Sequence, residues 1–461
     1  MSEYSARDQR LLMIAACAGI FIMPFMATMM NLSLISIGSE FNIGSKKMAM
    51  IDTMYILGTV ITMIPVAKLA DIVNRKKILF AGLAIIIVSL LLSTISISFE
   101  MLIILRLIGG IGGATLSVVF IAMITDAFPS GKRGWAIGLY TTSIYLGLAI
   151  GPSIGGIIND TFGWRSLFLF AIPFTVVSLI ALMMFKKEIY PNKKDKLDIS
   201  GAVLYMISIS AVILGFAYLP EIWAMLLLIA GLILLTIFIT MMKHRDSPVL
   251  NIDIFKLKTF SRSCIAALMT YGASYSVSFF LALYLQTVGG MSASHAGIVI
   301  FIQPLIQMLF TAKMGALSDK MYDKRILPTF GMILVSAGII MILCYSTQLN
   351  IYLVYATMMT IGFGFAMFSA PNNNTIMSSV PPSRRGEASG IMALSRQIGM
   401  AISMSVAMCT ITLIMGSIDN LDPSRYGDFI TVMHISFAIC LIMCIIGIVT
   451  SWRCNKCAEN V

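Results

Sequence analysis

Charged residues are scarce in this sequence. Only 11% of its 461 residues are Asp, Glu, Lys or Arg, whereas 58% are hydrophobic. Soluble globular domains carry about 25% charged residues, so the composition excludes an ordinary soluble protein and predicts a chain that crosses a membrane many times. The net charge of +11 does not indicate a nucleic-acid surface, because the basic residues lie in short clusters between apolar runs.

Metal-binding and disulfide patterns are missing as well. Two of the eight cysteines form the pair Cys454-x-x-Cys457, which lacks the four ligands of a structural zinc site. The other six lie in apolar runs, where cysteine is usually a small packing residue: Cys17, Cys264, Cys344, Cys409, Cys440 and Cys444. The three histidines are scattered, and no G-x-x-x-x-G-K-[ST] loop for ATP is present. We therefore expect no metal, no cofactor and no enzyme active site.

Apolar runs dominate what remains. Fourteen are long enough to span a membrane at roughly 20 residues each. They cover residues 11–32, 48–70, 78–98, 101–125, 134–157, 166–185, 200–218, 222–242, 260–286, 294–314, 327–346, 351–378, 387–415 and 429–451. An even number places both termini on one side. Most of the 32 Lys and Arg residues then fall on that side, which the positive-inside rule makes the cytoplasm.

The ends of the first and fifth spans indicate the compartment. Arg7 and Arg10 precede an apolar run too long for a signal-peptide core, so we expect this span to be retained. The sequon at Asn159 lies against a span end, where it is a poor glycan acceptor. These features favour a multi-pass protein of a prokaryotic cell membrane with both termini in the cytoplasm.

A repeated loop pattern predicts two similar halves. Ala67-x-Leu69-x-Asp71 follows the second span, and Gly315-x-Leu317-x-Asp319 follows the tenth. The two loops are equivalent if two spans were inserted between two six-helix bundles. We predict an N-terminal bundle at 1–185, a linker with two inserted, peripheral helices at 186–258, and a C-terminal bundle with a short cytoplasmic tail at 259–461.

The fifth span contains a regular glycine pattern. Gly147, Gly151 and Gly155 are four residues apart and share one helix face, with Pro152 and Gly156 beside them. Such a helix is poor in water but survives in a bilayer, where a bare face lets another helix approach closely. We expect this face to pack against a helix of the other bundle and to control leak; the alternative is a packing face with no role in transport.

These motifs resemble those of the major facilitator superfamily of transporters. The glycine pattern resembles the antiporter signature of its fifth helix, and the repeated loops resemble its cytoplasmic motif G-x-L-x-D-R-x-G-R-[RK]. The resemblance implies a cytoplasmic gate formed by Asp71, Arg75, Asp319 and Lys320. The first loop departs from the motif at three positions: Ala67, Ile72 and Asn74.

Further motifs resemble the fourteen-span drug:proton antiporter family. They are Leu105-Arg106 with its following glycines, Asp198-x-x-Gly201, Tyr284-Leu285-Gln286, Pro371-Asn372-Asn373-Asn374, Arg385-Gly386-Glu387-Ala388-Ser389-Gly390 and Arg396-Gln397-x-Gly399. This resemblance implies an all-α major facilitator fold with fourteen transmembrane helices, and proton-coupled efflux of small amphipathic compounds by alternating access.

The first span departs from that family. Where relatives read D-x-T-x-V-N, this chain has Met26 in place of the acid and keeps Asn31. Apart from Glu387 at a span edge, Asp52 is the other carboxylate within a span. A desolvated Asp can titrate near neutral pH, so we expect Asp52 and Arg106 to couple transport to protons, or Asp52 to be hydrated and inert.

Polar, tyrosine and methionine side chains inside the spans predict a substrate cavity. Its expected lining is Met26, Asn31, Arg106, Tyr271, Tyr275, Gln303, Gln307 and Asn372. The alternative for the glutamines is hydrogen bonding between helices. Away from the cytoplasmic span ends, the basic residues are Arg106 and, if its turn is buried, Arg396, whereas Asp52 is the single carboxylate. We therefore expect neutral, zwitterionic or anionic substrates to be preferred over dications.

Several functions remain open. The leading hypothesis is a monomeric exporter whose partners are a small amphipathic molecule, protons and the lipid bilayer, with no nucleic acid. A facilitator or symporter for a metabolite or lipid-like substrate is the first alternative. A membrane-embedded lipid-modifying enzyme or a non-transporting sensor is the alternative from another class.

Overall fold

The computed structural model describes residues 4–43, 45–187, 197–219, 221–291, 293–415 and 425–453. These residues form α-helices and two short 3-10 helices, with no strand among them. The side chains of Asn31 and Pro152 lie outside the described part, as do Cys454 and Cys457. The 3-10 helices are η1 (Ile252–Lys256) and η2 (Pro382–Arg384), and the α-helices are α1 (Ala6–Glu40), α2 (Ser45–Ile72), α3 (Arg75–Thr94), α4 (Phe99–Ala127), α5 (Ser130–Phe162), α6 (Arg165–Met184), α7 (Ile199–Ala217), α8 (Ile222–Met242), α9 (Lys258–Thr287), α10 (Ala293–Lys320), α11 (Ile326–Ile342), α12 (Ile351–Ser378), α13 (Arg385–Met415) and α14 (Tyr426–Trp452).

The helices are long because their sequences are apolar throughout rather than on one face. Twelve stretches of the described chain are long and apolar enough to cross a membrane, and the 17-residue α11 is shorter. The all-helical membrane fold is therefore confirmed, whereas the count of fourteen spans stays a prediction. Several helices begin where a polar side chain accepts a backbone N–H, as at Ser98, Asp198 and Asn350. The Asp198-x-x-Gly201 motif is thus the N-cap of α7.

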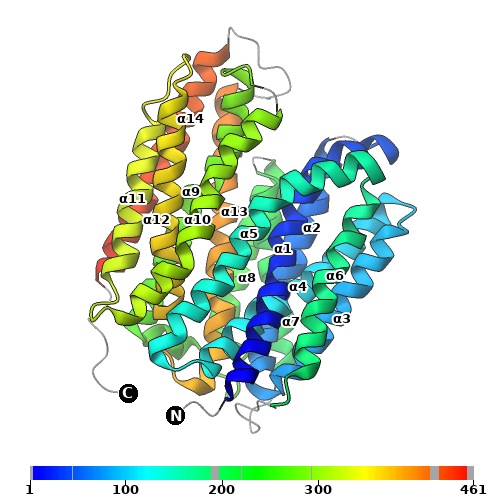
Figure 1. Cartoon of the computed structure of the whole chain (residues 1–461), viewed down its shortest axis with the longest axis vertical. Helices are drawn as coiled ribbons and strands as arrows, with labels where there is room; N and C mark the ends of the chain where they lie inside the picture. Colours follow the sequence, from blue (N-terminus) through cyan, green and yellow to red (C-terminus); the bar gives the residue numbers. More distant parts are fainter. Residues whose placement is uncertain are drawn as a thin grey trace.

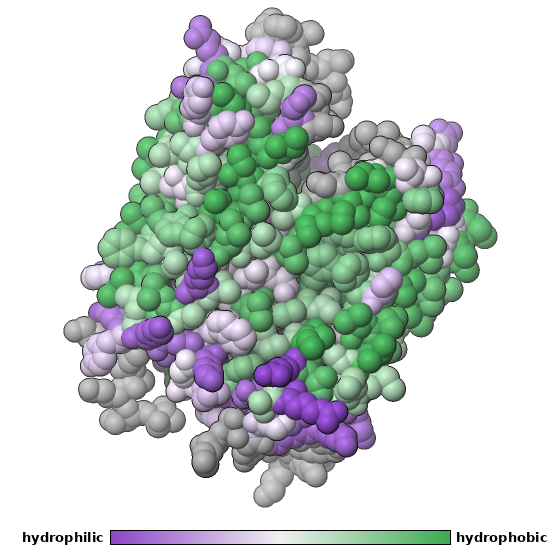
Figure 2. All heavy atoms as spheres, viewed as in Figure 1, coloured by the Kyte–Doolittle hydropathy of each residue, from purple (hydrophilic) through white to green (hydrophobic). Residues whose placement is uncertain are grey.

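Two groups of helices lie side by side (Figure 1). We name α1–α6 the N-terminal bundle and α9–α14 the C-terminal bundle. They converge at the end where α1 begins and α14 ends, which we call the termini end, and diverge at the opposite end. There the surface is hollowed between them, above a broad apolar band (Figure 2). The molecule is therefore closed at the termini end and open at the other.

The inserted helices α7 and α8 lie at the periphery. The Tyr205 hydroxyl of α7 donates to the Val60 carbonyl of α2 at 2.9 Å, and Ser405 of α13 donates to the Phe216 carbonyl of α7 at 3.1 Å. α8 packs on α7 and exposes apolar side chains such as Trp223 and Ile233. Because α2 and α13 belong to different bundles, α7 touches both.

The glycine face of α5 does not pack against the other bundle, and that expectation is wrong. A Cβ on Gly147 would lie 2.7 Å from the Phe21 carbonyl oxygen of α1, and one on Gly155 would lie 2.8 Å from Met29 Cγ, also of α1. A Cβ on Gly151 would overlap Thr28, which also belongs to α1. Gly156 is half-buried. The face therefore joins α5 to α1 within the N-terminal bundle.

The reason is the helical period. Gly138 of α5 packs against α10 of the C-terminal bundle, where a Cβ would lie 2.9 Å from Ala312 Cα. Gly147 follows nine residues later, which is about two and a half helical turns. The two glycines therefore point to opposite sides of α5. Gly138 faces the C-terminal bundle, and Gly147 faces α1.

Candidate functional site

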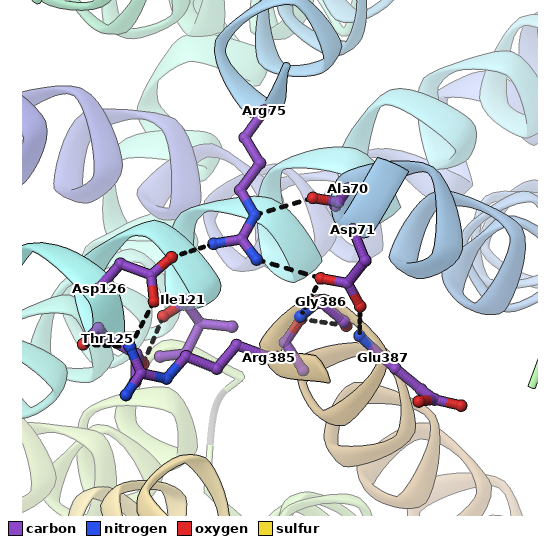
Figure 3. Close-up of polar contacts among 10 residues, drawn as sticks. Ala70, Asp71, Arg75, Ile121, Thr125, Asp126, Arg385, Gly386 and Glu387 are labelled. Atoms are coloured by element: carbon purple, nitrogen blue, oxygen red, sulfur yellow. Dashed lines mark hydrogen bonds and ion pairs between the residues drawn. The ribbon is translucent and has the colours of Figure 1, made fainter. Parts of the chain in front are cut away.

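The termini end is held shut by a carboxylate at a helix N-terminus. Asp71, at the end of α2, accepts hydrogen bonds from the backbone N–H groups of Gly386 and Glu387 in the first turn of α13, both at 2.9 Å (Figure 3). These donors have no partner within their own helix, and the helix dipole favours a negative charge there. Asp71 thus links the two bundles as an N-terminal cap.

A second link runs through a chain of charges. Arg75, fully buried at the start of α3, bonds Asp71 at 3.1 Å and the Ala70 carbonyl at 2.9 Å, and it also pairs with Asp126 of α4 (Figure 3). Asp126 in turn pairs with Arg385 of α13. A buried charge is tolerated when it is paired and hydrogen-bonded. Within this chain of charges, the Asp126–Arg385 pair is the link that crosses the junction between the bundles.

The same arrangement recurs on the other side of the junction. Asp319 of α10 accepts from the backbone N–H of Gly134 at 2.9 Å and of Trp135 at 3.1 Å, near the start of α5. The Asn374 amide of α12 also donates to Asp319, at 3.2 Å. The repeated Asp of each loop thus contacts the beginning of a helix in the opposite bundle.

Glycines make this contact possible. A Cβ on Gly386 would lie 2.7 Å from the Ala67 carbonyl oxygen, and one on Gly390 would lie 2.5 Å from Ala67 Cβ. Gly134 and Gly138 occupy the same places against α10. The segments Arg133-Gly134-x-Ala136-x-Gly138 and Arg385-Gly386-x-Ala388-x-Gly390 are therefore a second internal repeat, matched to the first.

Sequence reasoning found only part of this gate. Asp71, Arg75 and Asp319 lie at the junction, but Lys320 is exposed at the end of α10 and makes no hydrogen bond or ion pair among the described residues. Its assignment to the gate is corrected, because the side chain one position after Asp319 points about 100° away around the helix. Asp126 and Arg385 were missed. The second repeat was the signal that could have found Arg385.

A separate ion pair lies inside the N-terminal bundle. Arg106 Nη2 of α4 is 3.2 Å from Asp52 Oδ1 of α2, and the guanidinium lies 4.5 Å from the centre of the Tyr55 ring. Met26, only 3% exposed, lines a cavity of ≈ 20 Å³ together with Arg106 and Tyr55. Met26, where the family resemblance led us to expect an acid, therefore faces the Arg106 pocket, and the carboxylate paired with Arg106 is Asp52 of α2.

The other predicted cavity residues divide into two groups. Tyr271 of α9 is half-buried and packs edge-on to Phe365 at 5.5 Å, and Tyr275 is 46% exposed and lies within electrostatic range of Asp52. Gln303 and Gln307 are buried on α10, and Gln303 Oε1 has no hydrogen-bond donor among the described residues.

Asn372 differs from these residues because its amide already links two helices. It is 2% exposed and donates to the Ser263 carbonyl of α9 at 3.1 Å, within the C-terminal bundle. This bond joins α12 to α9, and the place of Asn372 in the substrate cavity stays a prediction.

Over the described residues, no group of three or more potential metal ligands is found.

Comparisons with known proteins find relatives that match most of this chain. The chain is 26% identical to the riboflavin transporter RibZ of Clostridioides difficile (strain 630) over 86% of its length and 87% of that protein. It is 25% identical to the multidrug resistance protein Stp of Mycobacterium tuberculosis (strain CDC 1551 / Oshkosh) over 87% of this chain and 75% of that one.

A solved structure and a family model extend the match. The proton:xylose symporter XylE superposes with a TM-score of 0.70 at 15% identity, covering 98% of this chain and 97% of that one, which shows a shared fold. The sequence model of the Major Facilitator Superfamily matches residues 14–404. The closed junction, the paired loops and this match give one conclusion: the chain is a multi-pass membrane protein that belongs to the major facilitator superfamily.

Proposed function

We propose that this protein is a secondary active transporter that exports small amphipathic compounds in exchange for protons by alternating access. The observation that carries the proposal is the doubled cap at the termini end, where Asp71 and Asp319 each contact a helix start of the opposite bundle. These contacts exist only while that end is closed. Rocking of the bundles would break both caps together and expose the centre to the other side.

The caps are suited to a switch because their strength is moderate. A side-chain cap contributes about 0.5–2 kcal/mol, which holds a state without locking it. A substrate or proton with a similar differential affinity for the two states can therefore shift the equilibrium. In this proposal the predicted bundles, 1–185 and 259–461, move as units, and both termini lie in the cytoplasm of a bacterial cell.

Proton coupling is assigned to the Asp52–Arg106 pair. Protonation of Asp52 would leave the Arg106 guanidinium with the Ile51 carbonyl, 3.5 Å from Nε, and the Tyr55 ring as its remaining close partners. An unpaired cation inside a bilayer costs several kcal/mol, so the helices that hold the pair would rearrange or admit water.

The test is proton flux in proteoliposomes that contain the purified chain and a trapped pH-sensitive dye. A cation (ethidium), a zwitterion (norfloxacin) and a neutral compound (riboflavin) are added under an imposed pH gradient. Proton movement that requires both protein and compound supports exchange. Compound uptake without any proton movement would contradict it.

A second candidate is an uncoupled facilitator for a metabolite. Met26 in place of the expected acid favours it, and so does the similarity to a protein named as a riboflavin transporter. In the same vesicles a facilitator would equilibrate its substrate at a rate independent of the pH gradient. Exchange therefore predicts a compound-dependent dye signal, and a facilitator predicts none.

A further inference from the structure

Two lysines at the termini end lack a counter-charge among the described residues. Lys77 lies in the first turn of α3, Lys186 lies two residues beyond the end of α6, and both side chains are exposed. Neither amine makes a hydrogen bond or an ion pair within the part of the chain that the structure describes. By contrast, the buried Arg75 at the start of α3 is paired with Asp71 and Asp126 at the gate.

A contact between their neighbours in the chain brings the two lysines together. The Lys76 amine donates to the Phe185 carbonyl, so the start of α3 is joined to the end of α6. The Phe185 ring stacks on Tyr4 with the ring centres 6.5 Å apart, and the Lys187 amine lies 4.2 Å from the centre of the Tyr4 ring. The beginning of α1 therefore adjoins the same place.

The charge at this place is positive on balance. Besides the four lysines, the first two turns of α1 expose Arg7 and Arg10. The carboxylate on the same part of α1 is Asp8, which is half-buried and accepts a hydrogen bond from the Ser5 hydroxyl at 2.6 Å. Membrane topology alone requires positive charge at this end, but it does not require the ends of two helices to be held side by side.

Each of the two lysines stands at the end of an exposed apolar stripe. Below Lys77, the α3 stripe has the spacing of one helix face and consists of Ala81, Ala84, Val88 and Leu91. The α6 stripe before Lys186 consists of Val176, Ile180 and Met183. Helices α3 and α6 pack against each other at the edge of the N-terminal bundle (Figure 1). Hydrophilic side chains gather at the termini end, next to the apolar band (Figure 2).

We propose that Lys77 and Lys186 bind the headgroup of an anionic phospholipid, from the leaflet at the termini end, whose acyl chains lie along the stripes of α3 and α6. Basic side chains at a membrane surface attract anionic lipids, and a lipid phosphate accepts hydrogen bonds from two amines at once. The acyl chains cover the exposed stripes at the same time. Because the whole site belongs to the N-terminal bundle, the lipid stays bound while the two bundles move.

The experiment measures which lipid remains on the purified full-length protein. Protein in detergent is equilibrated with equal amounts of phosphatidylglycerol and phosphatidylcholine that carry identical acyl chains, and the bound lipids are counted by native mass spectrometry. We expect phosphatidylglycerol to be bound at least about tenfold more often, since each surface lysine favours an anionic lipid by about fivefold. The double variant Lys77→Gln with Lys186→Gln should bring the two lipids within about twofold of each other.

Two further double variants separate a defined site from net charge. Lys77→Arg with Lys186→Arg keeps both charges and should keep the preference. Lys243→Gln with Lys320→Gln removes two exposed charges from the ends of α8 and α10 and should leave the preference unchanged. Glycerophosphoglycerol, which is the headgroup without acyl chains, should not displace the lipid at about tenfold excess, because the apolar stripes hold the chains.

Equal binding of the two lipids by the wild type, or an unchanged preference in Lys77→Gln with Lys186→Gln, would overturn the inference. An equal fall in Lys243→Gln with Lys320→Gln would mean that net charge alone attracts the lipid, and it would also overturn a defined site. Displacement by glycerophosphoglycerol would assign the lysines to a soluble phosphate, and displacement by polyglutamate would assign them to an acidic protein. Either displacement would contradict a lipid.

Discussion

Gly134 of α5 and Gly315 of α10 lie back to back across the junction of the two bundles, so close that a Cβ on either would overlap the carbonyl oxygen of the other. Both obstacles are backbone atoms, which cannot move aside as a flexible side chain can. Closure at the termini end therefore depends on the absence of a side chain at these two positions.

Gly315→Ala should shift the protein toward a state open at the termini end and slow transport at least several-fold. Accessibility of a single Cys introduced at the buried Thr311 position, in a background without other cysteines, measures the opening. Gly131→Ala is the matched control, because its Cβ would meet nothing within 4 Å. Unchanged labelling in Gly315→Ala would show that the junction tolerates the extra methyl group.

The Asp126–Arg385 pair should show energetic coupling across the bundles. In a double-mutant cycle of Asp126→Asn and Arg385→Gln, we expect an interaction energy of about 0.5–3 kcal/mol, measured from the fraction of closed molecules. Asp126→Asn alone should be the more damaging change, because it removes a partner from both Arg75 and Arg385. Additive single effects would exclude the pair from the gate.

Asp52→Asn should uncouple substrate movement from proton movement. The amide keeps the shape of the side chain but cannot exchange the proton, so the dye signal should disappear while substrate exchange between equal pH compartments persists. Asp52→Glu should retain part of the signal. If proton movement survives in Asp52→Asn, the carrier is elsewhere, and Glu387, buried at the gate, becomes the next residue to test.

Gly151→Leu should destabilise the protein rather than open a leak between the bundles. The new side chain would enter α1 at Thr28, and overpacking of this kind costs about 1–3 kcal/mol or more. The measurement is the thermal unfolding midpoint in detergent together with passive proton leak in vesicles. Gly297→Leu, at an open position of α10, is the control. A leak at unchanged stability would restore the sealing role.

Glu40 should contribute a pH-dependent stability at the end opposite the gate. Hydrogen bonds from Arg165 at 2.8 Å and from the Trp164 indole at 2.7 Å lower the pKa of this carboxyl below 4.5. Because the folded pKa is depressed, the stabilisation is complete above the unfolded value and is lost as the pH falls through the folded one.

Wild type and Glu40→Gln should therefore differ in unfolding midpoint at pH 7 and converge as the pH drops below 4.5. The difference should be small, at most about 1 kcal/mol, because exposed ion pairs contribute little. A difference that persists unchanged in acid would mean that the carboxylate charge is not its source.

The sequence by itself determined the membrane-spanning class and much of the gate. A long apolar run in a bilayer forms a helix, because the polar groups of its backbone must be hydrogen-bonded within the segment. The repeated Asp71 and Asp319 were visible as a pattern, since each lies one residue before the end of an equivalent helix. Asp52 and Arg106 could be singled out because charge inside a span is rare.

Tertiary structure alone decided which helices meet. Helical periodicity shows that Gly147, Gly151 and Gly155 share a face, but it does not name the neighbour, and that neighbour is α1. Asp126 and Arg385 are 259 positions apart, and no local rule links them. Whether a buried arginine is neutralised depends on carboxylates brought in from other helices. Arg106 and Arg396 therefore look alike in the sequence and differ in the fold, where Asp52 reaches Arg106 and leaves Arg396 without a counter-charge among the described residues.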